Sequence, residues 1–171
     1  MCCRLCTTNN QHNINHNKQF YQHKGRLLGP TFNTLNIMNS TYLINAIDGI
    51  ATADGYTFYS DGEERMSEQI KSYPAVWLQP PKFQQMEGRK HGKVTYDVTL
   101  HAMEAGAKLS PAERQQTWSR LEDELVEMFS KLSVAKRVIA VEGLKIRHTS
   151  STLTTHGEVA ATATAEVVTF F

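Results

Sequence analysis

Cysteine and histidine side chains, the usual ligands of zinc, are concentrated at the start of this 171-residue chain. All three cysteines, Cys2, Cys3 and Cys6, precede His12 and His16, whose spacing is one that zinc fingers use. The cysteines, however, lack the paired spacing that would complete a set of four ligands. Disulfides between cysteines so close in sequence would hold nothing together. We therefore expect neither a metal site nor a cofactor.

The remaining side chains that could do acid, base or metal chemistry are scattered. His148 and His156 flank one predicted turn, but no third ligand is indicated, and His101 lies on the polar face of a strand as a surface histidine would. Asp97 and Glu104 are an odd number of residues apart, so a strand points them to opposite faces. The chain also lacks phosphate-loop, dinucleotide-binding, nucleophile-elbow and zinc-protease motifs. We therefore expect that the protein is not an enzyme.

Two groups of charged residues are candidate functional surfaces. One is the segment 82–93, a predicted loop that joins two apolar runs into an antiparallel hairpin. Its candidate subunit-interface residues are Lys82, Phe83, Arg89, Lys90, His91 and Lys93. The other is an acidic surface on a predicted long helix, formed by Glu122, Asp123, Glu124 and Glu127. The basic loop either contacts phosphate or an acidic protein surface, or is simply a solvated hairpin tip.

The overall charge hides a division of the chain. With 18 Lys and Arg against 17 Asp and Glu, the formal net charge is +1. Residues 1–37 hold four basic and no acidic side chains, which leaves 14 basic and 17 acidic ones, or −3, in the remaining 134 residues. This composition disfavours a dedicated nucleic-acid-binding domain, which is usually strongly basic. No apolar run is long enough to suggest a membrane span.

Residues 1–37 are rich in asparagine and show neither a helical nor a strand period, so we expect an unstructured leader. No apolar segment of a secretory signal follows Arg4. Two interpretations stay open: an unstructured extension, or a mis-assigned translation start before Met38. The N-terminal mass of protein made from the native gene distinguishes them.

Residues 38–171 predict a single α+β domain. A helix is expected from Asn39 or Ser40 to about Ala53, and a long helix from Ser110, which forms a capping box with Glu113. Strands are expected over 56–59, 73–78, 94–102, 138–147 with a bend at Gly143, and 158–170. These elements predict a mixed or mainly antiparallel sheet of about four or five strands with two helices packed on one face.

The order of these elements resembles the tail terminator or tail completion proteins of long-tailed phages, the minor tail protein family of lambda-like phages. The tracts that carry the resemblance are Tyr73–Leu78, Tyr96–His101, the helix from Ser110 and the strand end Glu166–Phe170. It covers roughly residues 38–171, and the leader has no counterpart in the family pattern.

The resemblance implies a structural virion protein of the tail, assembled in the host cytoplasm. It implies a homohexameric ring that ends growth of the tail tube and joins the tail to the head. Its partners would be other copies of the chain, the tail tube protein and the head-side connector, with no membrane and no specific nucleic acid. From their opposite charges, we expect the basic segment 82–93 to contact the acidic helix surface of a neighbouring subunit in such a ring.

Three alternatives stay open. The chain could be a head-to-tail connector or neck ring component, or a small α+β enzyme or ligand-binding domain with a scattered site. It could also be a nucleic-acid-binding module in which Trp77 or Tyr96 stacks on bases. A ring protein requires oligomers that depend on concentration, an enzyme a concave pocket with convergent polar groups, and a DNA binder salt-dependent affinity.

Overall fold

A computed structural model describes residues 32–89, 91–149 and 152–171 of the chain. The three cysteines and the rest of the predicted leader before residue 32 lie outside the described residues, as does Lys90. The helices and strands, in chain order, are α1 (Phe32–Ala53), β1 (Thr57–Ser60), a short 3₁₀ turn (Glu63–Arg65), α2 (Met66–Gln69), β2 (Ala75–Leu78), β3 (Lys82–Glu87), β4 (Lys93–Glu104), α3 (Pro111–Ser133), β5 (Val138–His148) and β6 (Val159–Phe170).

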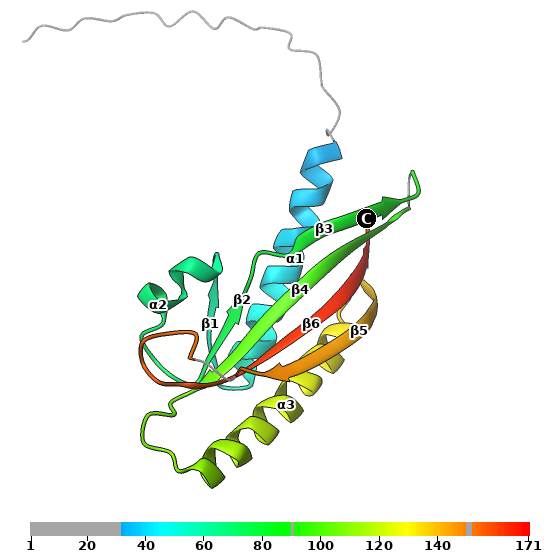
Figure 1. Cartoon of the computed structure of the whole chain (residues 1–171). Helices are drawn as coiled ribbons and strands as arrows, with labels where there is room; N and C mark the ends of the chain where they lie inside the picture. The colour runs from blue at the N-terminus through cyan, green and yellow to red at the C-terminus, as the bar shows by residue number, and fades with distance from the viewer. Residues whose placement is uncertain (1–31, 90, 150–151) are drawn as a thin grey trace, which may run out of the picture.

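The strands form one mixed sheet in the order β1-β2-β4-β6-β5, with β3 also paired to β4 (Figure 1). Among the strand pairs that the structure describes, β1 and β2 run parallel and the other pairs are antiparallel. The predicted α+β class is confirmed, and the described residues form six strands and three helices in place of the four or five strands and two helices expected. None of the helices in the described part of the chain is long and apolar enough to span a membrane.

The segment that the sequence suggested was a loop contains the extra strand, β3. The chain leaves the edge of β4 at Pro80 and Pro81, which have no backbone N–H to donate. It then returns to the same edge, where Phe83 lies opposite Tyr96. All six residues of β3 are exposed. An edge strand with no buried face shows little apolar alternation, and this is why the sequence pattern did not reveal it.

Helices α1 and α3 cover one face of the sheet, as predicted (Figure 1). Alternate residues of β4 and β6 point into the core between the layers, and the alanines of β6 let α3 approach closely. The predicted capping box of α3 is confirmed, because Ser110 accepts from the backbone N–H of Glu113 and Glu113 accepts from that of Ser110. These two hydrogen bonds lower the pKa of Glu113.

The start of α1 differs from the prediction. The helix begins at Phe32, within the segment expected to be unstructured, and not at Asn39 or Ser40. Asn39, the expected capping residue, is buried inside the helix. In the sequence, Phe32 and Leu35 continue the three- and four-residue spacing that leads to the buried Leu43. Most residues around Phe32 and Leu35 are polar, so the apolar spacing was not evident there. The predicted start of the helix was therefore placed too far along the chain.

Candidate functional site

The face of the sheet opposite α1 and α3 is called the open face here, and the described residues cover it at one end only. There Met66 and Ile70, from α2 and the residue after it, pack against Trp77 of β2. Tyr59 stacks on Trp77 with ring centroids 6.2 Å apart. The small helix α2 thus closes a second, minor core on the far side of the sheet from α1 and α3.

This packing removes the predicted base-stacking residues from the surface. Trp77 is 0% exposed beneath α2, and Tyr96 is 2% exposed on the helix-covered face. A side chain must present its ring to solvent to stack on a base. Neither Trp77 nor Tyr96 is therefore placed to stack on nucleic acid, as the nucleic-acid-binding alternative would require.

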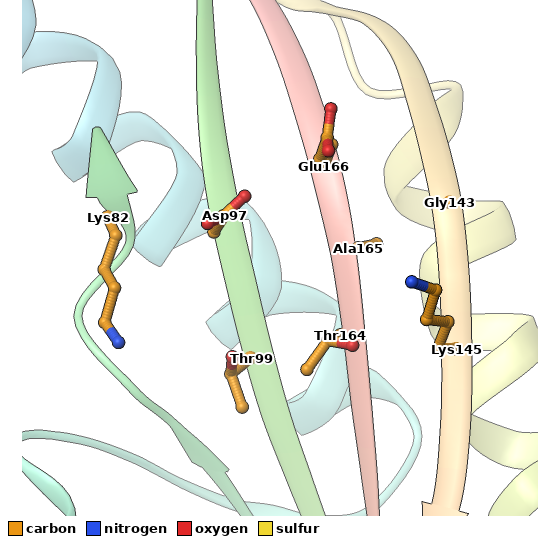
Figure 2. Close-up of a pocket in the computed structure, with 8 residues that line it drawn as sticks. All are labelled: Lys82, Asp97, Thr99, Gly143, Lys145, Thr164, Ala165 and Glu166. Carbon is orange, nitrogen blue, oxygen red and sulfur yellow. The ribbon is translucent and has the colours of Figure 1, made fainter. Parts of the chain in front are cut away.

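The uncovered part of the open face is polar and shallow. Figure 2 shows the side chains that line its concave surface, standing on four neighbouring strands. These residues are Lys82 on β3, Asp97 and Thr99 on β4, Thr164, Ala165 and Glu166 on β6, and Gly143 and Lys145 on β5. Of the ionisable groups, Asp97 is half-buried and the others are exposed. The surface is thus a set of solvated charges on rigid strands.

A row of carboxylates runs straight across this face. Asp97 lies opposite Glu166, and Glu166 lies opposite Glu142. Directly opposite residues on neighbouring antiparallel strands have Cβ atoms about 4.5–5.5 Å apart, so like charges there are destabilising. Asp97 accepts a hydrogen bond from Gln84. Glu142 and Glu166 form no ion pair within the described part of the chain. We call Asp97, Glu166 and Glu142 the carboxylate row.

Together with Lys82, this row reaches a free edge of the sheet at each end. Lys82 of β3 lies opposite Asp97 at one end, and Glu142 of β5 forms the other end. In the described residues, β3 pairs with β4 alone and β5 with β6 alone, so both outer edges carry unpaired backbone groups. Among the same residues, no group of three acidic, histidine or cysteine side chains is arranged to hold a metal ion.

The predicted interface residues gather on one projecting hairpin. Figure 1 shows the β3–β4 hairpin extending past the end of β6. Lys82 lies on the open face, and Lys93 is the first residue of β4. Phe83 makes an edge-to-face contact with Tyr96, with ring centroids 6.2 Å apart. Arg89 and His91 are exposed at the tip, and Lys90 lies outside the described residues. Two apolar side chains of β3 also face solvent, Phe83 at 50% and Met86 at 37% exposure.

The predicted acidic surface on α3 is largely engaged within the subunit. Glu122 pairs with His148 at 2.8 Å, and Glu127 pairs with Lys131 at 2.9 Å. Glu124 accepts from the Tyr56 hydroxyl. Burial raises the pKa of Glu124, and the nearby charges of Asp54 and Glu127 add to the rise. Of the four acidic residues, Asp123 alone has no such partner among the described residues.

His101 lies on the open face as expected, but it is buried and not a surface histidine. The Gln79 side-chain amide donates to Glu63 at 3.0 Å and lies 3.1 Å from His101 Nε2, so this ring nitrogen accepts. Its Nδ1 then donates to Thr162 Oγ1 at 2.9 Å. Burial lowers the pKa of His101, and the charge of Arg147 lowers it further, against the opposing effect of Glu63.

This arrangement predicts a loss of stability in mild acid. Because the folded-state pKa of His101 lies below the unfolded value of about 6.5, protonation favours the unfolded chain. The free energy of unfolding should fall as pH drops below about 6.5, by at most about 1.4 kcal/mol per pH unit from this group. Urea unfolding from pH 7.5 to 5.5 measures it. The variant His101→Gln should flatten the dependence, and His156→Gln, at an exposed site, should not.

Sequence reasoning missed the carboxylate row and the free edge at Glu142. The sequence places Asp97 and Glu166 at polar positions of two alternating strands. It does not show that they lie opposite each other, because that depends on the pairing of β4 with β6. Glu142 follows an apolar run and precedes the Gly143 bulge, so its face could not be assigned from the period alone.

No known protein family matches the chain, and a search of curated proteins finds no match.

Proposed function

We propose that the protein is a structural subunit of a phage tail. In this proposal it forms a homohexameric ring that ends growth of the tail tube and joins the tail to the head-side connector, in the virion and without catalytic turnover. The observation that carries the proposal is the projecting hairpin, whose strand β3 is exposed along its whole length and has a free outer edge. The element order that resembles the tail terminator family supports it.

An exposed strand edge with apolar side chains is a liability for a protein that acts alone. Such an edge pairs readily with another chain, and natural proteins usually shorten, charge or cover it. The exposed Phe83 and Met86 add apolar area that a neighbour would bury. The second free edge, at β5, lies on the opposite side of the sheet. Two different patches on opposite sides favour a head-to-tail contact, which closes into a ring when the rotation permits.

The basic hairpin tip gives a first test of this assembly. Changing Arg89→Glu together with Lys90→Glu should change the strength of association and its salt dependence several-fold, because the charge of the tip is reversed beside the strand edge that we propose meets a neighbouring subunit. Sedimentation velocity at low and high salt measures the effect. The matched control is Lys71→Glu with Lys108→Glu, which changes net charge equally at exposed sites outside the hairpin. Equal assembly of both variants would contradict a role for the tip.

The function itself is tested with the tail tube protein of the same phage. Adding the purified full chain to growing tubes should stop elongation and leave a ring visible at one tube end by electron microscopy. Tubes that grow to the same length with and without the chain would contradict the proposal. A head-to-tail connector or neck component would instead bind filled heads in the absence of tails.

A further inference from the structure

We infer that the free edges of β3 and β5 pair with each other between copies of this chain. In this arrangement Val138–Glu142 of one copy adds as an antiparallel strand to Lys82–Glu87 of the next, with Glu142 opposite Lys82. The inference rests on the proposed ring and names the surface that builds it.

Strand direction permits this pairing without any rearrangement. Strand β3 is antiparallel to β4, β4 to β6, and β6 to β5, so β3 and β5 run in opposite directions within one sheet. A second copy placed beside the first in the same orientation therefore brings its β3 antiparallel to the first copy's β5. Each contact formed in this way joins two different edges, so it is a head-to-tail contact and not a two-fold one.

Charge and side-chain direction agree at one register. Lys82 and Glu142 occupy the same lateral row of the open face, at its two ends. Within a single subunit that row reads one positive charge followed by three negative charges. Joining copies places the unpaired Glu142 beside a neighbour's Lys82, so the carboxylate row has a positive charge at both ends. Opposite charges facing each other across strands are favourable.

The same register matches apolar residues on the helix-covered side. Phe83 falls opposite Val141, and Met86 opposite Val138; their partners within the subunit show that all four point to this side. Both strands also carry an irregularity, between Phe83 and Gln85 in β3 and between Val138 and Ala140 in β5. The extra residues, Gln84 and Ile139, are offset from each other by one position, and the register is the same before and after the two irregularities.

The structure also sets where this pairing must stop. Beyond Lys82, the same side of the sheet is extended by β1, which occupies the outer edge of β2. In β5, the register shifts after Glu142 and Gly143 has a positive φ of 63°. Such a bulge bends a strand away from its previous line. The bend lies at the point where a longer pairing would collide with β1.

Disulfide cross-linking in solution tests the inference. The natural cysteines are first replaced by Cys2→Ser, Cys3→Ser and Cys6→Ser. Lys82→Cys and Glu142→Cys are then introduced together into the full chain. Directly opposite residues of antiparallel strands have Cα atoms about 4.5–5.5 Å apart, within the range of a disulfide. Mild oxidation should give a ladder of cross-linked oligomers up to the ring. Lys82→Cys with Arg147→Cys, which lies beyond the bulge, is the matched control and should give none.

The outcomes separate this inference from the proposed function. Assembly of the cysteine-free chain without a ladder above the control would overturn the strand pairing and leave the ring in place. Dimers from Lys82→Cys alone would indicate a two-fold contact between β3 strands and would also overturn it. A cysteine-free chain that stays monomeric at every concentration would overturn the ring and the pairing together.

Discussion

Lys82→Glu and Glu142→Lys should each weaken assembly, and an equal mixture of the two variants should restore it. Each single change places like charges across the joined edges, two carboxylates in the first variant and two ammonium groups in the second. A cross-strand charge pair contributes up to about 1 kcal/mol, so its reversal costs roughly 1–2 kcal/mol at each contact. This corresponds to association that is about tenfold weaker. In a closed ring the loss recurs at every subunit.

The recovery of assembly in the mixture follows from the same strand pairing. A Lys82→Glu copy has a negative charge at position 82, and the Glu142→Lys copy supplies the positive charge at position 142 that attracts it. The reverse contact is the natural one, Lys82 opposite Glu142. An alternating ring therefore has an attractive pair at every contact, which an even number of subunits allows. Sedimentation velocity of each variant and of the mixture measures this, and a mixture no better than its components would contradict it.

Monomer stability provides an internal control for these variants. Glu142→Lys replaces one of the carboxylates facing Glu166, so it should leave the monomer as stable or slightly more stable. Lys82→Glu adds a negative charge beside Asp97 and should slightly destabilise it. Weaker assembly in both variants, despite opposite effects on unfolding, would show that misfolding is not the cause.

Trp77→Ala should have the largest effect on stability, costing about 3–5 kcal/mol. The side chain is wholly buried between β2 and α2, and its loss leaves a cavity beneath Met66 and Ile70. Its indole N–H has no hydrogen-bond partner within the described residues. Trp77→Phe should therefore cost much less, because it retains an aromatic ring and removes a buried, unpaired donor.

Chemical denaturation followed by circular dichroism measures both variants. A DNA-binding role for Trp77 would predict another result, a loss of DNA affinity with little change in unfolding. A Trp77→Ala variant as stable as the parent chain would contradict the burial of this side chain beneath α2.

The sequence was informative wherever one face of an element is buried. The alternation in β4 and β6, the apolar stripe of α3 and the Ser110 capping box were sufficient to predict these elements. They are set by local periods and by residue types that the backbone requires at helix ends. The α+β class follows from their order.

The parts that could not be predicted depend on pairing across the sheet. Strand β3 has no buried face, so Lys82–Glu87 gives no apolar alternation to detect. The carboxylate row exists only once β4, β6 and β5 are in register, and three residues far apart in the sequence meet there. The hydrogen bonds of His101 likewise come from Gln79, after β2, and from Thr162 on β6. The candidate site is thus a property of the topology.

The central claim is that this chain assembles head to tail into a closed ring. The most direct measurement is the mass of the assembly formed by the full chain, by native mass spectrometry or sedimentation equilibrium across a wide concentration range. We expect a discrete species of six 19.3 kDa subunits, in equilibrium with monomer and without open-ended larger forms. A chain that remains a 19.3 kDa monomer at every concentration would contradict it.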